Sequence, residues 1–283
     1  MRGSSVSHTS LKIGLIIDLQ NVRKGEVVVE NIEGIAKLKE MIDESSKIVF
    51  FGGAGVSTES GIPDFRSKDG LYNQHDVRFD KYQPEYLLSH SCLMREPKVY
   101  FEFHRQKMDT RNIEPNNAHK YLAKLEETGK LIGVVTQNID GLHQKAGSKR
   151  VFEIHGSALR NYCMNCGTSY PVDYIFDSED EIPKCDYCGG TVRADITLYE
   201  EGLPEDQVEG AIRAISEADM MIIGGTSLTV YPAASFVNYF KGKYLVIINE
   251  SDLAVRKAEN TLIIRDKIGK VFTELAEMQG IDL

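Results

Sequence analysis

The chain has 283 residues, of which 42% are hydrophobic, and this is enough to bury the core of one large domain and a smaller one. Its formal net charge of -9 and its pI of about 5.4 argue against nucleic acid as a partner, because phosphate binding needs a positive field. No apolar run approaches the roughly eighteen residues that span a bilayer, so no membrane insertion is expected. The first ten residues lack the apolar stretch of a signal peptide. We therefore expect a cytoplasmic protein whose five cysteines stay reduced.

Strand and helix patterns alternate along most of the chain. Apolar residues recur at helical spacing from Asn31 to Ile42, and a buried strand is predicted at 47–51, directly before the glycines of "GGAG". Similar apolar strands that end in small polar residues are predicted at 131–136, 220–225 and 244–249, with helices at 117–128 and 205–217. This alternation predicts a parallel sheet covered on both faces, with ligands beyond the carboxyl ends of its strands.

We therefore expect an α/β fold with a Rossmann-like, doubly wound parallel sheet and an inserted smaller domain. Residues 67–115, rich in aromatic and charged side chains, and residues 160–198, which hold four cysteines, break the alternation and are assigned to the insertion. Residues 1–30 are left unassigned. The sheet domain is expected to comprise 31–66, 116–159 and 199–283.

Two CxxC pairs predict a metal site. Cys163 and Cys166 form the first pair, and Cys185 and Cys188 form the second, with eighteen residues between them. Two such knuckles can complete a tetrahedral shell of thiolates around one structural Zn²⁺, with no position open for water. Scattered thiols or a redox pair are the alternative, and the matched spacing disfavours both. Cys92 has no partner of this kind and is expected to be a small buried side chain.

The glycine-rich stretch 52–66 follows the first predicted strand. Its backbone amides and the hydroxyls of Ser57 and Thr58 could hold a phosphate group. The strict GxGxxG dinucleotide fingerprint fails, because Thr58 stands where the third glycine would be. Without further context, this stretch is equally typical of a tight strand-helix turn, and the lone His155 is more often structural than catalytic.

Several strings occur together in a fixed order: "GAGVSTESGIPDFR", "TQNIDGLH" (136–143), "HGS" (155–157), the paired CxxC set, "GGTSLTVYPAA" (224–234) and "INES" (248–251). With this set, spread over roughly residues 35 to 275, the chain resembles the sirtuin family, and within it a bacterial-type single-core member. The resemblance implies an NAD-dependent protein-lysine deacetylase, at once a transferase and a hydrolase. Such an enzyme moves the acyl group from lysine to ADP-ribose and releases nicotinamide, deacylated lysine and 2'-O-acetyl-ADP-ribose.

The resemblance also implies a role for each matching residue. NAD would be a consumed co-substrate in a Rossmann-like domain, and residues 67–115 would contain a cofactor loop and a helical module. The implied catalytic residues are His155, Asn138, Asp140 and Arg66. The implied NAD-binding residues are Gly53, Ala54, Gly55, Thr58, Asp64, Phe65, Arg66, Gln137, Asn138, Ile139, Asp140, His155, Thr226, Ser227, Asn249, Glu250 and Ile268.

Among these, His155 would be the general base that takes a proton from a ribose hydroxyl, a task suited to an imidazole. Asn138 would order the ribose and a water molecule. Ile139 and Asp140 would contact the nicotinamide carboxamide, and Phe65 would shield the reacting carbon from water. Nicotinamide would be a product that can also inhibit.

The implied partner is acetylated lysine on a protein or peptide. Residues 192–204 resemble the family segment that pairs with the substrate backbone, so the peptide would add as a strand between this segment and 226–232. Ala194, Thr197 and "LYEE" depart from the family pattern there. Sirtuins that favour acidic acyl groups carry a Tyr-x-x-Arg pair, and we expect Phe101 and His104 at the matching place. Because a buried unpaired carboxylate is costly, a succinyl group is disfavoured and an acetyl or longer neutral group is expected.

Three alternatives remain open from the sequence. Mono-ADP-ribosyl transfer would use the same fold and the same cleavage of NAD. A zinc-ribbon module could bind a peptide or nucleic acid without turnover, but residues 160–190 hold two basic residues against six acidic ones, which disfavours nucleic acid. An NAD-dependent dehydrogenase would cycle NAD without releasing nicotinamide.

Overall fold

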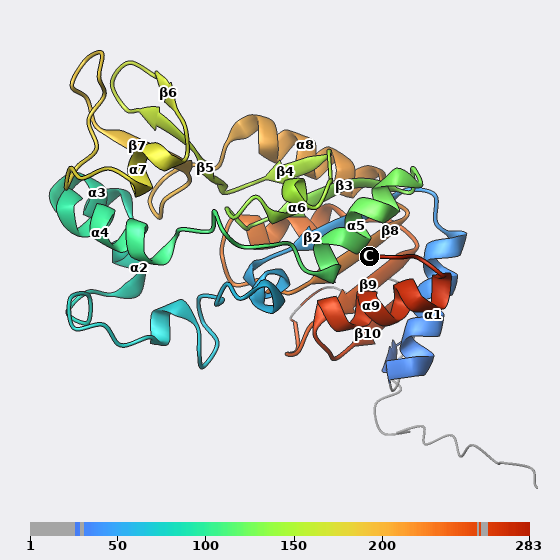
Figure 1. Ribbon diagram of the computed structural model, residues 1–283. Coiled ribbons are helices and arrows are strands. Elements are labelled where there is room, and N and C mark those ends of the chain that lie inside the picture. The colour runs from blue at the N-terminus through green and yellow to red at the C-terminus, as the bar shows by residue number, and fades with distance from the viewer. Residues whose placement is uncertain (1–25, 29–30, 254, 256–259) are drawn as a thin grey trace, which may run out of the picture.

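The computed structural model describes residues 26–28, 31–253, 255 and 260–283. Among these residues, seven strands form one sheet in which every neighbouring pair is parallel, and a smaller lobe adjoins one end of it (Figure 1). The spatial order of the strands is β1-β10-β9-β8-β2-β3-β4. Their bounds are β1 Glu26–Val28, β2 Ile48–Gly52, β3 Leu131–Thr136, β4 Val151–Glu153, β8 Met220–Gly224, β9 Tyr244–Ile248 and β10 Asn260–Ile264.

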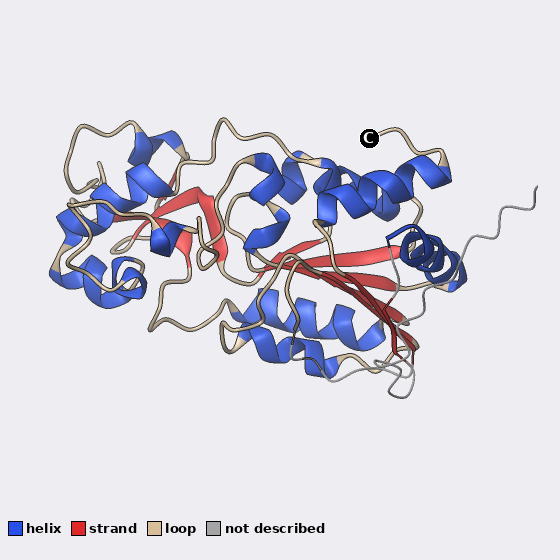
Figure 2. Cartoon of the chain, turned by 90° about the horizontal axis from the view of Figure 1, so that it is seen from below, coloured by secondary structure: helices blue, strands red, loops and turns tan. Residues whose placement is uncertain are grey.

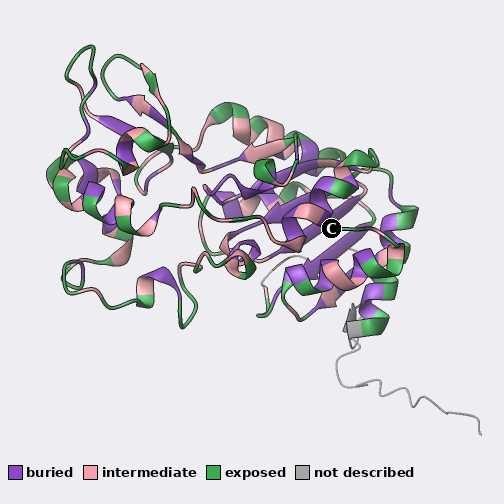
Figure 3. Cartoon of the chain, in the orientation of Figure 1, coloured by how far each residue is buried: buried purple, intermediate pink, exposed green. Residues whose placement is uncertain are grey.

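The central strands are buried on both faces, which explains why they are continuous apolar runs (Figure 3). In β2, Ile48 and Phe50 face one hydrophobic cluster, whereas Val49 and Phe51 face the other. Helices lie on both sides of the sheet (Figure 2). The first face is covered by α1 (Asn31–Glu44), α5 (Asn117–Glu127) and α9 (Ile268–Gln279), and the second by α8 (Glu205–Glu217) and the 3₁₀ helix η4 (Ala233–Tyr239).

The smaller lobe joins two segments that lie far apart in the sequence. Its antiparallel sheet has the order β6-β5-β7, and its helices come from both segments. The two segments share one hydrophobic cluster, in which Cys92 and Tyr100 pack with Ala158 and Val192. The elements are β5 (Gly156–Cys163), β6 (Ser169–Tyr170), α7 (Asp173–Phe176), β7 (Val192–Ile196), α2 (Pro84–Leu87), α3 (His90–Arg95) and α4 (Pro97–Lys107).

Short turns take the place of a long helix directly after β2. The 3₁₀ turns η1 (Ala54–Val56) and η2 (Thr58–Ser60) follow that strand, η3 (Leu71–Asn73) lies further along, and α6 (Leu142–Lys145) follows β3. The Gly55 amide donates to the Gly225 carbonyl at 2.8 Å. A Cβ at Gly55 would lie 2.8 Å from the Gly225 Cα, so the loops after β2 and β8 can meet backbone to backbone only because both residues are glycine.

The predicted fold class is confirmed, since the sheet is parallel, covered on both faces and joined to a smaller lobe. Strands predicted at 47–51, 131–136, 220–225 and 244–249 correspond to β2, β3, β8 and β9, and the predicted helices correspond to α1, α5 and α8. The sequence did not reveal β1 and β4, which have three residues each, or β10, whose run begins with the polar Asn260 and Thr261. Strand β1 lies within the segment left unassigned, and the rest of residues 1–30 lie outside the described residues.

Within the described ranges, no helix has both the length and the apolar character needed to cross a bilayer.

Candidate active site

A cavity of about 630 Å³ lies at the carboxyl ends of the central strands, where the smaller lobe meets the sheet. Its walls come from the turns after β2, β3, β8 and β9, from the loop that begins at Asp64, and from the segment after β7. Each of the seventeen residues expected to bind NAD lines this cavity, including Ile268 at the start of α9. The fold therefore brings together motifs that the sequence spreads over more than 200 residues.

Ser57 is the centre of a buried hydrogen-bond network at the inner end of this site. Its hydroxyl donates to Asp140 Oδ2 at 2.6 Å and accepts from Asn138 Nδ2 at 3.0 Å. The Leu142 amide donates to Asp140 Oδ1 at 2.9 Å. Burial raises the pKa of Asp140, which the Ser57 bond partly counters. The sequence identified Asn138 and Asp140 as site residues. It suggested Ser57 only as a hydroxyl that could bind phosphate.

His155 has one ring nitrogen occupied by the backbone. Its Nδ1 lies 2.9 Å from the Gln137 carbonyl oxygen, and because a carbonyl can only accept, Nδ1 carries the proton in the neutral ring. The basic lone pair is then on Nε2. Burial lowers the pKa of His155, which favours this neutral form near neutral pH.

The backbone next to His155 leaves no space for a side chain. Gly156 has a φ of 75°, and a Cβ there would lie 2.1 Å from the Asp195 carbonyl oxygen on β7. Only glycine combines this left-handed conformation with so close an approach. The glycine of "HGS" thus fixes where β5 begins and where the imidazole of His155 lies.

The loop from Asp64 to Asn73, here called the 64–73 loop, forms a compact unit over the cavity. Asp64 Oδ1 accepts from the amides of Arg66 and Ser67 at 2.9 and 2.7 Å, so this carboxylate caps its own loop. The Phe65 ring packs 5.3 Å from that of Tyr72. Asp64, Phe65 and Arg66 all line the cavity.

The opposite end of the cavity is held by amide side chains. Asn249 Oδ1 accepts from the Thr226 amide at 3.1 Å, and Gln137 Nε2 donates to Thr226 Oγ1 at 3.0 Å. These contacts connect the turns after β3, β8 and β9. A contact that the sequence did not suggest joins Glu59 to the Gly269 amide at the start of α9, at 2.6 Å.

Phe101 and His104 are absent from the cavity lining, so the structure gives no support to the expectation that these two positions meet the acyl group. Both side chains are fully buried in the smaller lobe, where the His104 ring stacks on Tyr100 and Phe176. A string match does not specify the rotation of α4 about its axis, which is set by packing. Lys107, at the end of α4, and the adjoining Met108 reach the cavity instead.

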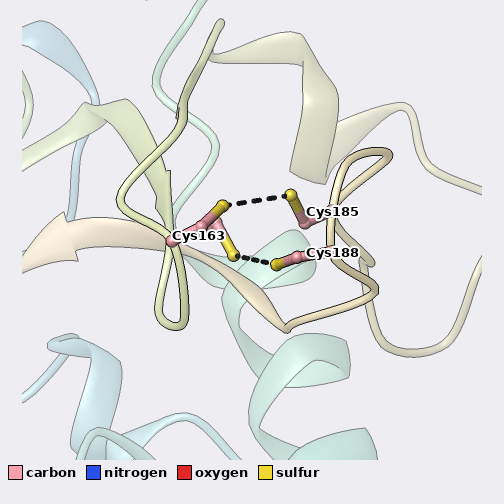
Figure 4. A group of neighbouring side chains, drawn as sticks. Cys163, Cys185 and Cys188 are labelled. Carbon is pink, nitrogen blue, oxygen red and sulfur yellow. Dashed lines mark hydrogen bonds between the residues drawn. The ribbon is translucent and has the colours of Figure 1, made fainter.

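The four paired cysteines come together at one point (Figure 4). Their Sγ atoms all lie within 4.8 Å of one another, with 3.5 Å between Cys163 and Cys188 and 3.6 Å between Cys166 and Cys185. A tetrahedral zinc with Zn–S bonds of about 2.3 Å would separate its sulfurs by roughly 3.8 Å, so the cluster can hold such an ion. Cys92 lies elsewhere, and burial raises the pKa of its thiol to about 12, as expected for an inert side chain.

The chain matches known proteins over most of its length. The family model described as the Sir2 family matches residues 53–232. A protein of Clostridium acetobutylicum named NAD-dependent protein deacetylase is 55% identical over 240 residues, which cover 85% of this chain and 97% of that protein. Proteins of the same name from Clostridium perfringens and Staphylococcus aureus strain N315 are 56% and 42% identical. They cover 86% and 84% of this chain, and 98% and 96% of their own lengths.

Solved structures match as well. A Sir2 variant with a deacetylated p53 peptide and 3'-O-acetyl-ADP-ribose has a TM-score of 0.79 at 34% identity, over 88% of this chain and 99% of its own. A Sir2 complex with a p53 peptide and NAD⁺ has a TM-score of 0.76 at 35% identity, with the same coverage. Sir2Tm bound to a propionylated peptide has a TM-score of 0.77 at 33% identity, again over 88% and 99%.

Proposed function

This chain belongs to the Sir2 family, and we propose that it deacetylates protein lysines with NAD as a consumed co-substrate. The acetyl group passes from lysine to ADP-ribose, one water molecule is consumed, and nicotinamide, free lysine and 2'-O-acetyl-ADP-ribose are released. Close relatives named NAD-dependent protein deacetylase and Sir2 structures with acylated peptides support this activity. The observation that carries it is the geometry of His155, whose basic Nε2 belongs to a ring that lines the cavity and is oriented by the backbone.

NAD supplies the chemistry by providing a ribose carbon from which nicotinamide can leave. Around it, Ile139 and the buried Asp140 would contact the carboxamide, and the buried Asn138 would order the ribose. Asn138 and Asp140 are both held in place by hydrogen bonds to Ser57. Phe65 keeps water from the reacting carbon, because its ring packs in the loop that covers the cavity. His155 Nε2 accepts the proton from a ribose hydroxyl and so prepares this oxygen to receive the acetyl group.

The adenosine half of NAD would lie toward Thr226, Ser227, Asn249 and Glu250, where bonds between three turns keep the polar groups in place. The four cysteines would hold one structural Zn²⁺, since their spacing suits a closed tetrahedral shell. The peptide would add as a strand along residues 192–204. Nicotinamide would bind in the same inner pocket and inhibit. We do not assign a nucleic-acid partner, and the cytoplasmic location stays a prediction.

The acyl preference now has a different basis. Neutral acyl groups are supported by the apolar part of the lining, but Lys107 lines the same cavity and is half-buried. Because this cation could pair with a carboxylate, Lys107 favours an acidic acyl group such as succinyl, and Phe101 and His104 do not oppose it from outside the cavity lining. The apolar lining residues on this side are Leu71, Leu88, Met108, Ile139 and Ile196.

The decisive experiment incubates the chain with an acetyl-lysine peptide, with and without NAD, and follows peptide mass and free nicotinamide together. We expect equal amounts of deacetylated peptide and nicotinamide, only when NAD is present. His155→Ala should abolish deacetylation, whereas His75→Ala, at a side chain that is 97% exposed, should leave it unchanged. Nicotinamide release with an unchanged peptide would instead indicate ADP-ribosyl transfer or hydrolysis of NAD.

A further inference from the structure

Tyr199 connects the cavity wall to the 64–73 loop. Its hydroxyl accepts from Arg66 Nη2 at 3.2 Å and lies 3.3 Å from the Tyr72 hydroxyl. The guanidinium carbon of Arg66 lies 5.6 Å from the centre of the Tyr72 ring. These three side chains, here called the loop clasp, all line the cavity.

The backbone of Tyr199 is fixed from the other side. Its amide donates to the Leu88 carbonyl at 3.0 Å, and its carbonyl accepts from the His90 amide at 3.0 Å. These two bonds form a bridge to the helical module between α2 and α3. The backbone that carries the phenol ring is therefore bonded to the helical module and not to the loop.

The next residue, Glu200, strengthens this anchor. It has a φ of 76°, in the left-handed region that residues other than glycine rarely adopt. Its carboxylate accepts from the Ser91 amide at 2.9 Å, and Glu201 forms an ion pair with the buried Arg193. Strained residues persist where their surroundings over-determine them, and they gather at functional sites.

The 64–73 loop has few other polar attachments. Asp64, Ser67 and Asn73 bond within the loop, through the Asp64 cap and through Asn73 Nδ2, which donates to the Ser67 carbonyl at 2.6 Å. In the part of the chain that the structure describes, each side-chain hydrogen bond that leaves this loop ends at Tyr199. The clasp is therefore the polar contact between this loop and the rest of the fold, beside the apolar packing of Leu71 in the cluster that includes Leu87 and Phe103.

We propose that Tyr199 is a positioning residue whose hydroxyl holds the 64–73 loop over the cavity and thereby strengthens NAD binding. This proposal rests on the proposed function, because Phe65 and Arg66 lie on that loop and line the site assigned to NAD. The phenol acts through Arg66 and Tyr72 and makes no bond to the reacting atoms. The departure "LYEE" from the family pattern thereby gains a role in NAD binding.

The test is Tyr199→Phe, which keeps the ring and removes only the hydroxyl. We expect the KM for NAD to rise roughly three- to tenfold, as for a hydrogen bond to a charged group that solvent partly screens. The kcat should stay within about twofold, and the KM for the acetyl peptide should rise less than the KM for NAD. Hydrogen exchange at the amides of residues 64–73 should become faster. Tyr239→Phe, at a half-exposed tyrosine outside the cavity lining, is the matched control and should change none of these.

A second variant tests the clasp as a unit. Tyr72→Phe removes only the contact between Tyr72 and Tyr199, whereas Tyr199→Phe removes this contact and the one to Arg66. The double variant should therefore have the same KM for NAD as Tyr199→Phe alone. Unchanged KM and unchanged exchange in Tyr199→Phe would overturn the proposal. So would an equal rise in both KM values with a lower Tm, since that pattern indicates simple packing. Exchange is measured without NAD or peptide, so a wild-type chain that fails to deacetylate would reject the proposed function while the exchange result still decides on the clasp.

Discussion

The Nδ1 atom of His155 lies 2.9 Å from the carbonyl oxygen of Gln137, and this contact decides which ring nitrogen is basic. Gln137 belongs to the turn after β3, and His155 directly precedes β5. The orientation of the proposed base is thus fixed by a main-chain atom that no side-chain substitution removes.

Deacetylation should lose activity in acid only below about pH 6.5, the ordinary value for histidine. Burial lowers the pKa of His155, so the neutral ring that can accept a proton persists to lower pH. The measurement is kcat/KM for the acetyl peptide from about pH 5 to pH 8. An acid limb centred above pH 6.5 would contradict the assignment, because it would require a neighbouring anion that raises the pKa.

The stability of the fold should fall in mild acid. Burial lowers the pKa of both His104 and His119 to about 4, and it places that of His143 well below 6.5. Because these folded-state values lie below the unfolded one, the unfolded chain binds more protons under pH 6.5. The stabilisation is complete above pH 6.5. It falls by about 1 kcal/mol per histidine for each pH unit below this, down toward pH 4.

His104→Phe separates one part of this effect. Both ring nitrogens of His104 lack a hydrogen-bond partner among the described residues, and the ring stacks on two aromatic side chains, so phenylalanine suits the site. Urea unfolding should show a free energy of unfolding that falls between pH 7.5 and about pH 5.5, and this fall should be smaller by roughly 1 kcal/mol in the variant. The ratio of deacetylation to desuccinylation should not change. A changed ratio would mean that this position does reach the acyl group.

Gly156→Ala should damage both folding and activity. The added Cβ would meet the Asp195 carbonyl and would also have to adopt a φ of 75°. Gly129→Ala is a matched control, because its φ is 79° but nothing lies within 4 Å of the added atom. We expect the free energy of unfolding of the control to fall by about 1 kcal/mol from backbone strain alone, and its activity to be kept. The free energy of unfolding of Gly156→Ala, measured with denaturant, should fall clearly more than that of Gly129→Ala. Its kcat should also fall, because β5 and His155 must move.

Cys163→Ser and Cys185→Ser should each lower zinc content and melting temperature together. The binding of a structural zinc contributes folding free energy, roughly 10 kcal/mol in small zinc domains, so loss of one ligand should cost much of the lobe's stability. Cys92→Ala, a buried cysteine outside the cluster, should lose some stability but keep full zinc content in metal analysis. A Cys163→Ser variant that is stable and contains no zinc would contradict a structural role for the metal.

The sequence determined those features whose signal is local. Strands β2, β3, β8 and β9 are apolar runs of five or six residues because both faces of a parallel sheet are buried, and such runs are visible without a structure. The CxxC pairs place two thiolates on each knuckle through chain geometry alone. The residues expected to bind NAD lie on motifs whose order follows the order of the strands, and since parallel strands end at one edge, these residues meet in one cavity.

Tertiary structure decided the rest, because packing between distant segments has no local signature. Ser57 bonds Asp140, 83 residues away, and Arg66 bonds Tyr199, 133 residues away. Phe101 and His104 match a motif by position. Packing of α4 within the smaller lobe nevertheless buries both side chains away from the cavity. A string of residues specifies which side chains a helix carries. Which of them reach the substrate depends on the rotation of that helix, and the free energy of packing against its neighbours sets this rotation.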